Sequence, residues 1–340
     1  MSKREPAAFI LVLAAALAIR LFLLAVPGAP KTDVFYYDTQ AVSDLLRGAN
    51  PYGHIYVVPP TVATPGAARV FAYLPGVFAF LVPAGAAMDI RVGLILADVV
   101  AAISLYAIRG KYSVWSAAIF LLLPPTILFS TWFPDNSMPA IAFLAVAIAV
   151  ESRGKRWASA ALWGLAAASS QLVWLVFPLY LYRSYKLNRL RDAAVSGLVA
   201  VATVVPFLLW APGTFFYDTT LFQFEREALS LVTPGPFGIN LNLSIQGIAS
   251  TLGFSVPLVV RAGVVVLVLA VAMRYVKGSL GSLLLASTLF LTVTLFVLPE
   301  DLYLAYFELP LFMLLAWFAL RGERAAAPRE APEAPPSLKT

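Results

Sequence analysis

The sequence predicts an all-α polytopic membrane protein, and three observations support this prediction. Its 340 residues are 61% hydrophobic, and the mean hydropathy is +0.84. Only 12% of the residues are charged, about half the share of a soluble domain. The apolar residues form stretches long enough to cross a bilayer, where a helix satisfies its own backbone. These features exclude a soluble enzyme, a nucleic-acid-binding domain and a disordered chain.

The apolar stretches predict about ten crossings. The expected spans cover about 7–26, 91–108, 112–130, 137–150, 192–210, 256–273, 279–298 and 302–320. Residues 157–182 have basic residues at both ends, which predicts two short helices that meet near Ser169–Gln171. The stretch 73–87 is interrupted by proline and is short for a span, so we expect it to lie in the interface or to re-enter the membrane.

The loops predict one membrane domain, 1–324, with three outer segments and no separate soluble domain. The outer segments are a long first loop at 27–90, a short second loop at 131–136, and a loop at 211–243. Within the first loop, 38–48 has the apolar spacing of a short amphipathic helix. Lys and Arg residues gather in the other connections, so both termini are expected in the cytoplasm. The Ala/Pro/Glu-rich tail, 325–340, is predicted to be a disordered cytoplasmic segment.

The composition also limits the chemistry. The chain has no cysteine and one histidine, His54. Disulfides, cysteine nucleophiles and multi-histidine metal centres are therefore excluded. The 24 basic residues are scattered in short loops, which is typical of membrane topology and gives no nucleic-acid-binding patch. The outer carboxylates would suit one divalent cation, but no DxD motif stands in the expected loop, so no cofactor is implied.

Two outer acids lie where chemistry at the membrane surface is possible. Asp33 follows the first span closely, so its carboxylate could act as a general base on a hydroxyl held at the surface. From its position alone, a solvated loop acid that caps the next helix is the favoured interpretation. Asp135 stands in a very short loop, where it could hold a sugar hydroxyl or cap the helix that starts near Ser137.

The segment DVFYYDTQAVSDLLRGANPY resembles the first outer loop of GT-C glycosyltransferases, integral membrane enzymes that use polyprenyl-phosphate sugars. Within these enzymes, the segment most resembles the polyprenyl-phosphate-mannose-dependent mannosyltransferase branch. The matching residues are Asp33, Tyr37, Gly48, Asn50-Pro51-Tyr52, then Tyr73 and Pro75, and Asp135 in the second outer loop. The paired short helices of the family match GLAAASSQLVWLVFPLYLY. The resemblance covers roughly residues 7–182. It departs at Ser170, where the family often has a Lys before the Gln.

The resemblance implies a GT-C-like fold and an inverting transfer of a hexose, mannose for preference. The donor would be a polyprenyl (for example dolichyl) phosphate sugar, and the acceptor a lipid, glycan or protein at the outer face of the cell membrane, in synthesis of an envelope glycan. Asp33 would be the base, assisted by Asp135. The expected substrate contacts are Tyr37, Asp38, His54, Tyr73, Gln171, Glu300 and Asp301. Positive charge for the donor phosphate would come from Lys31, Arg69, Arg226 or Arg261.

Two alternatives remain open on the sequence. Asp98 and Glu308 fall inside predicted spans, where ionisable groups are costly and often functional. They could line the path of a transporter or flippase for a lipid-linked or small substrate, or they could pair with Arg20 or Arg261. The second alternative is an inactive GT-C-like assembly partner, which Ser170 in place of the family's Lys favours.

Overall fold

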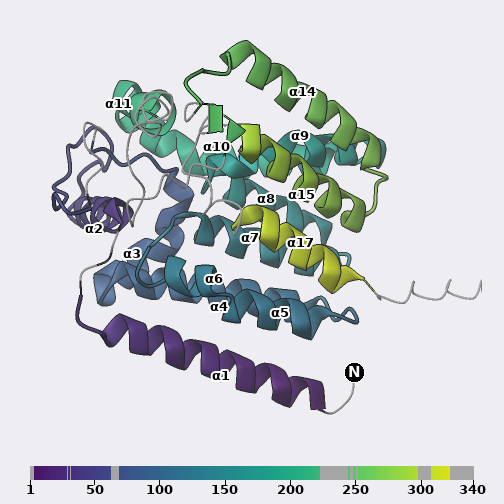
Figure 1. Cartoon of the computed structure of the whole chain (residues 1–340), viewed down its shortest axis with the longest axis horizontal. Helices are drawn as coiled ribbons and strands as arrows, with labels where there is room; N and C mark the ends of the chain where they lie inside the picture. Colours follow the sequence, from purple (N-terminus) through teal and green to yellow (C-terminus); the bar gives the residue numbers. More distant parts are fainter. Residues whose placement is uncertain are drawn as a thin grey trace, which may run out of the picture.

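The computed structural model describes residues 4–28, 30, 32–62, 69–222, 244–245, 248–249, 252–297 and 308–321. Over these residues the chain is all helix and loop, without a strand. Most helices run side by side along the long axis, and the short helices α2 and α11 lie together at one end (Figure 1). The all-α class predicted from composition is thereby confirmed.

The helices follow the chain in order. They are α1 (Arg4–Ala25), α2 (Asp33–Leu46), the 3-10 turn η1 (Pro75–Val77), α3 (Phe78–Ala87), α4 (Ile90–Ala107), α5 (Ser113–Leu122), α6 (Pro124–Phe129), α7 (Ser137–Glu151), α8 (Arg156–Ala167), α9 (Gln171–Lys186), α10 (Leu190–Trp210), α11 (Pro212–Phe216), the π-helical turn η2 (Tyr217–Leu221), α14 (Leu258–Tyr275), α15 (Leu280–Val297) and α17 (Leu309–Leu320).

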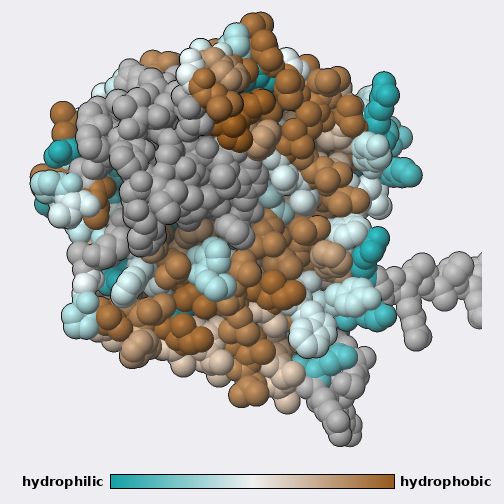
Figure 2. Space-filling view, in the orientation of Figure 1, coloured by the Kyte–Doolittle hydropathy of each residue, from teal (hydrophilic) through white to brown (hydrophobic). Residues whose placement is uncertain are grey.

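Five of the described helices are long and apolar enough to cross a membrane: α1, α4, α10, α14 and α15. Shorter apolar helices lie at Pro75–Ala87, Ser113–Leu122, Ser137–Glu151 and Leu309–Leu320. Helices α1, α10 and α14 expose large apolar side chains, among them Phe22, Leu209 and Val259. Brown apolar surface covers much of the visible face in Figure 2. Such faces are stable against lipid tails, so the chain is a polytopic membrane protein.

The core forms where α7 packs against α4 and α8, and α8 packs in turn against α10. Small residues permit this close packing. A Cβ on Gly164 of α8 would overlap the carbonyl oxygen of Ser196 on α10. Close backbone approach at small residues is the usual way in which membrane helices associate, because lipid tails give no hydrophobic drive between them.

The structure confirms the paired short helices and corrects two boundaries. Helices α8 and α9 meet at residues 168–170, as expected. The single span expected at 112–130 is instead two helices, α5 and α6. The break falls at Leu123, before Pro124, because a residue preceding proline avoids the helical region. Helix α2 begins at Asp33 rather than near residue 38. The negative charge of Asp33 in the first turn is favourable beside the positive end of the helix dipole.

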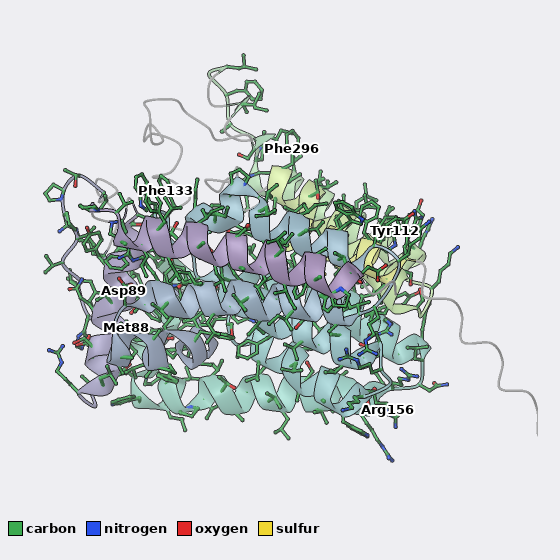
Figure 3. All side chains as sticks on the ribbon, turned by 90° about the horizontal axis from the view of Figure 1, so that it is seen from below. Met88, Asp89, Tyr112, Phe133, Arg156 and Phe296 are labelled. Atoms are coloured by element: carbon green, nitrogen blue, oxygen red, sulfur yellow. The ribbon has the colours of Figure 1, made fainter. Side chains whose placement is uncertain are left out.

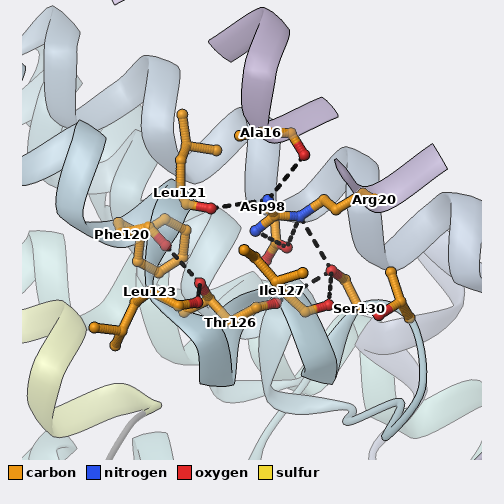
Figure 4. A network of polar contacts seen from close by, with 10 residues as sticks. Ala16, Arg20, Asp98, Phe120, Leu121, Leu123, Thr126, Ile127 and Ser130 are labelled. Atoms are coloured by element: carbon orange, nitrogen blue, oxygen red, sulfur yellow. Dashed lines mark hydrogen bonds and ion pairs between the residues drawn. The ribbon is translucent and has the colours of Figure 1, made fainter. Parts of the chain in front are cut away.

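A buried ion pair ties α1 to α4. The Arg20 Nη2 atom lies 3.0 Å from Asp98 Oδ2, and neither side chain is exposed. Arg20 Nε also donates to Ser130 Oγ at 3.2 Å (Figure 4). This confirms the pairing of Asp98 with Arg20 that the sequence left open. Glu308 lies at the start of α17 and is buried.

The two ends of the bundle differ in character. We call one the loop end; it comprises residues 32–62, 69–76, 131–136, 168–171 and 211–222. We call the other the basic end; it comprises residues 107–112, 151–156, 183–191, 274–280 and 320–321. In Figure 3, Met88, Asp89 and Phe133 lie at one end, whereas Tyr112 and Arg156 lie at the other, where nitrogen-bearing side chains gather.

Candidate active site

Helix α2 carries the residues that the sequence singled out first. Its apolar spacing buries Tyr37, Asp38, Ala41 and Val42 against the bundle. Asp33 stands one turn before Tyr37, and the Tyr37 hydroxyl lies 3.4 Å from Asp33 Oδ2. Residues four apart share one helix face, so this pair is set by the helix itself. Asp33 remains partly exposed.

The second outer loop is attached to the start of α2. The Thr32 hydroxyl donates to the carbonyl oxygen of Pro134 at 3.3 Å. The Asn136 amide donates to Asp38 Oδ1 at 2.8 Å. These two contacts join segments about a hundred residues apart in the sequence. They bring Asp33, Asp38 and Asp135 into one acidic cluster at the loop end, close enough for Asp33 and Asp135 to act electrostatically on Asp38.

Asp38 is the buried member of this cluster. Its side chain is completely shielded, and burial raises its pKa well above the usual value. The Asn136 hydrogen bond opposes that shift, while the charges of Asp135 and Asp33 add to it. Asp38 Oδ2 has no hydrogen-bond partner among the described residues. A carboxyl group in such surroundings holds a proton where exposed carboxylates have lost theirs.

Asp135 has a structural task at the start of α7. Its Oδ1 accepts from the Ser137 backbone N–H at 2.7 Å and from the Ser137 hydroxyl at 2.5 Å. The sequence offered Asp135 as the N-cap, but the N-cap residue is Asn136, and Asp135 stands one position before it. From there it satisfies a backbone donor that the helix leaves unpaired. The side chain is half-buried, so these hydrogen bonds do not remove it from solvent.

The chain after α2 turns back through residues 50–56. Asn50 Oδ1 accepts from the Tyr52 backbone N–H at 3.0 Å, which closes an Asx turn. Gly53 then adopts φ +85°, a left-handed conformation that glycine tolerates best. Its N–H donates to Asp218 Oδ2 at 2.7 Å. The turn therefore fixes the first outer loop to η2, far along the chain.

A second polar cluster follows from this turn. His54 Nδ1 lies 3.2 Å from Asp44 Oδ2. The Tyr56 hydroxyl lies 3.1 Å from Asp44 Oδ2 and 2.6 Å from the Pro51 carbonyl oxygen, so it can donate to either acceptor. Burial raises the pKa of Asp218 to about 6, while the Gly53 hydrogen bond and the His54 charge oppose the rise. His54 thus belongs to the Asp44 cluster, which adjoins the Asp33 cluster through the rings of Tyr37 and Tyr56, 6.4 Å apart.

Residues 71–76, which contain the Tyr-x-Pro stretch and which we call the wall, contact the turn between α8 and α9, which we call the helix tip. The Gln171 amide donates to the carbonyl oxygens of Ala72 at 3.0 Å and Thr219 at 3.2 Å. The Gly76 N–H donates to the Ala168 carbonyl oxygen at 2.7 Å. The backbone carbonyl oxygen of half-buried Tyr73 accepts a hydrogen bond from the Tyr52 hydroxyl at 2.8 Å. Gln171 therefore positions the wall.

Ser170, which stands where the family often has Lys, caps α9. Its hydroxyl oxygen accepts from the Leu172 N–H at 3.3 Å. A serine is a good residue for this position because its oxygen pairs with a free donor of the first turn. Ser170 therefore has a local structural role at the start of α9.

The basic residues expected at the donor phosphate are only partly described. Arg69 is exposed, beside the wall that begins at residue 71. Arg261 lies in the first turn of α14 and is buried. Lys31, Arg226, Glu300 and Asp301 lie outside the described residues. Within the described part of the chain, no three His, Asp or Glu side chains are grouped as metal ligands.

Sequence reasoning missed four residues that hold the site together: Asn136, Asp44, Tyr56 and Asp218. Asn136 could have been found, because it follows Asp135 in a loop too short to leave the surface. Asp44 and Tyr56 belong to the first outer loop but carry no motif. Nothing in the spacing relates Gly53 to Asp218, 165 positions later.

Comparisons with known proteins complete the description. No protein-family model matches the sequence, and no curated protein matches it. Among solved structures, the chain is similar to the crystal structure of ArnT from Cupriavidus metallidurans in the apo state, with a TM-score of 0.45 and 14% sequence identity. The similarity covers 92% of this chain and 77% of that chain.

Proposed function

We propose that the chain is a membrane glycosyltransferase of the GT-C type whose reaction takes place at the loop end. It would move a hexose, mannose for preference, from a polyprenyl phosphate sugar to a lipid, glycan or protein acceptor. The observation that carries the proposal is the acidic cluster of Asp33, Asp38 and Asp135, assembled from two distant loops at one end of an apolar bundle. The family resemblance of the first loop supports the same chemistry.

The three carboxyl groups differ in what they can do. Asp38 is buried, with a raised pKa that favours its neutral form. Asp135 uses one oxygen to accept two hydrogen bonds from Ser137 at the start of α7. Asp33 is partly exposed beside a tyrosine hydroxyl, so a substrate hydroxyl can reach it. Environments that separate neighbouring acids in this way commonly assign their roles as base and proton holder. Asp33 is accordingly the proposed general base.

The proposed reaction is a single displacement. The Asp33 carboxylate accepts the proton of the acceptor hydroxyl as the hydroxyl oxygen forms a bond to the anomeric carbon. The bond from that carbon to the phosphate oxygen breaks, and polyprenyl phosphate leaves with the electron pair. Attack opposite the leaving group inverts the anomeric configuration. Phosphate leaves without a strong acid, so what it needs is nearby positive charge.

Exposed Arg69 is the described residue best placed to supply that charge. It lies two positions before the wall at residues 71–76, and its carbonyl oxygen accepts from the Tyr56 N–H at 2.7 Å. The main chain is therefore fixed, while the guanidinium group remains free to turn toward a lipid phosphate. Arginine suits this role because its planar donors pair with two phosphate oxygens at once. Lys31, Arg226 and Arg261 stay as further candidates.

The transporter alternative loses its main support. Asp98, the span acid that suggested a transport path, is used in a fully buried ion pair with Arg20. A transport path would need polar groups near the midplane that a substrate can reach. The glycosyltransferase proposal requires instead that the loop end face outward. The Lys and Arg residues of the basic end favour that orientation, since such residues stay on the cytoplasmic side.

Transfer of radiolabelled sugar tests the proposal. Purified protein in nanodiscs is given short-chain polyprenyl phosphate mannose, with host membrane extract as the acceptor source; glucose and arabinose donors run in parallel. We expect a new labelled product with mannose and loss of it in Asp33→Asn. The matched control is Asp89→Asn, because Asp89 caps α4 and pairs with Arg91 at 2.7 Å. Absence of transfer with every donor would favour the inactive-partner alternative.

A further inference from the structure

A cavity lies at the basic end, far from the acidic cluster. Its volume is about 240 Å³, below the roughly 300–1,000 Å³ of pockets for whole small molecules. It forms where the ends of α7, α9 and α17 meet the beginnings of α8, α10 and α15. The lining residues are Glu151, Ser152, Gly154, Arg156, Arg183, Arg189, Leu280 and Leu320.

Part of the lining is a fixed, neutral pair. Arg183 Nη2 lies 2.6 Å from Glu151 Oε1, and the two side chains are 8% and 12% exposed. Glu151 Oε2 accepts from the Ser159 hydroxyl at 3.1 Å, and Arg183 Nε donates to the Gly278 carbonyl oxygen at 2.7 Å. Both groups are thereby held in place. Each oxygen of the Glu151 carboxylate thus already has a partner of its own.

Arg156 and Arg189 supply positive charge without such compensation. Neither guanidinium forms an ion pair or side-chain hydrogen bond with any of the residues that the structure describes. Arg156 rests on the Trp157 ring, 5.3 Å from its centroid, which leaves its donors available. Three arginines and one glutamate give the lining a net positive charge. An electropositive cavity of this kind calls for an anion.

Two helix beginnings point the same way. Arg156 is the first residue of α8, and Arg189 immediately precedes α10. Neither helix start has a side-chain cap, so backbone N–H groups of the first turns lack side-chain acceptors. The positive ends of the two helix dipoles therefore add to the arginine charges. The buried Asp192 in the first turn of α10 offsets part of the contribution of that helix, whereas the first turn of α8 carries no acid, so the arrangement favours phosphate.

The apolar part of the lining and its surroundings indicate that the anion belongs to a lipid. Leu280 and Leu320 line the cavity beside its arginines. Exposed Trp157, Tyr185 and Tyr275 stand at the same end, where aromatic side chains mark the level of lipid headgroups. Basic pockets between helix ends on the cytoplasmic side are suited to anionic headgroups. Figure 3 places Arg156 at this end, among the gathered nitrogen atoms.

We propose that this cavity binds the phosphate of an anionic phospholipid headgroup through Arg156 and Arg189, with the Arg183–Glu151 pair as its rigid base and Leu280 and Leu320 against the first carbons of the lipid. The site is separate from the proposed active site. It does not depend on the chain being a glycosyltransferase, because every residue that carries it lies at the other end of the bundle.

Lipid retention by the purified full chain tests the site. The protein is placed in phosphatidylcholine nanodiscs, with or without phosphatidylglycerol or cardiolipin, and bound lipid is counted by native mass spectrometry. Melting temperature is read in parallel. The test variant is Arg156→Gln with Arg189→Gln. Its control is Arg191→Gln with Arg274→Gln, which removes equal charge from exposed residues of the basic end that do not line the cavity.

We expect wild type and control to retain anionic lipid and to melt at higher temperature with it. The test variant should bind it about 10- to 30-fold more weakly, from the loss of two arginine contacts. Equal loss in the control would overturn the site in favour of diffuse surface charge. An equal rise in melting temperature with inorganic phosphate, in phosphatidylcholine alone, would overturn the lipid assignment and leave a free anion as the ligand.

Discussion

The transmembrane core and the loop end each bury a carboxyl group, and they stabilise it in opposite ways. In the core, Asp98 forms an ion pair with Arg20 at 3.0 Å. At the loop end, Asp38 is equally buried, yet its described partner is the neutral Asn136 amide. A buried charge is costly unless it is paired, and the alternative is to keep the proton. The core therefore holds a fixed charge pair, whereas at the loop end burial favours the neutral form of the acid.

The two buried acids therefore have different proposed roles, one in holding helices together and one beside the proposed base. A fully buried ion pair is out of reach of a substrate, so Arg20 and Asp98 join helices. An acid whose surroundings favour its neutral form, beside an accessible carboxylate, is an arrangement that proton-transfer sites use. The comparison thus supports the proposal that the chemistry lies with Asp33 and its neighbours, and it predicts that substitutions in the two regions change different quantities.

The largest expected effect is on stability, from breaking the core pair. Asp98→Ala leaves the Arg20 guanidinium buried without its carboxylate, which should cost about 3–5 kcal/mol of unfolding free energy. The double variant Arg20→Met with Asp98→Leu should recover most of this loss, because it removes both charges. Thermal unfolding in detergent checks both. If Asp98→Ala unfolds like the wild type, the pair does not hold α1 to α4.

Replacing Asp38 by a neutral residue of the same shape should affect stability less than removing its side chain. Asp38→Asn keeps a neutral group that can pair with Asn136, so we expect stability within about 1 kcal/mol of wild type and retained sugar transfer. Asp38→Ala leaves the Asn136 amide without its partner and should cost about 1–3 kcal/mol. Melting curves and transfer rates of the two variants make the measurement. Complete loss of transfer in a stable Asp38→Asn would mean that Asp38 acts as the ionised base.

The close contact between the wall and the helix tip can be tested by substituting Gly76. A Cβ on Gly76 would lie 2.7 Å from the carbonyl carbon and oxygen of Ala168, and backbone atoms cannot turn aside. Gly76→Ala should therefore cost about 1–3 kcal/mol and reduce transfer by displacing Tyr73. Gly197→Ala is the control, since a Cβ there meets nothing within 4 Å. Equal melting temperatures of the two variants would contradict the close contact between wall and helix tip.

The smallest expected effect concerns pH. Burial raises the pKa of Asp218 to about 6 from a usual value of 3.8. The folded state therefore binds this proton more tightly than the unfolded chain, so the contribution to stability is complete below about pH 4 and is lost as pH rises through about 6. Asp218→Asn should still accept from the Gly53 N–H, and it should raise the melting temperature at neutral pH by roughly 1–4 °C.

The pH course of the two proteins provides the check. The melting temperature of wild type minus that of Asp218→Asn should become more negative between pH 4 and pH 7. A constant difference over that range would show that Asp218 is not responsible.

Much of the helical order could be predicted from the sequence, because span length and Lys/Arg position are one-dimensional signals. The turn between α8 and α9 followed from basic residues on both sides of 157–182. The break at Leu123 could have been predicted too, had the weight of Pro124-Pro125 been set against the apolar length. The pairing of Asp98 was foreseen only as one of several possibilities.

The site was harder to predict, because its contacts join distant segments. Asp33 and Asp135 each stood out by their place near a span. That Asn136 would pair with Asp38, or Gly53 with Asp218, depends on how the loops fold over one another. No periodicity or local motif carries that information. Gln171 illustrates the same limit: the motif identified the residue, but not its contacts with Ala72 and Thr219.

The most direct test compares the two regions in one assay, by measuring initial rates of mannose transfer for Asp33→Asn and for Arg20→Met with Asp98→Leu, alongside their melting temperatures. Loss of a general base should lower the Asp33→Asn rate by about 10²–10⁴-fold at an unchanged melting temperature. The core double variant should keep a rate close to wild type. Full transfer by Asp33→Asn, with transfer abolished in a stable core variant, would contradict the assignment of the chemistry to the loop end.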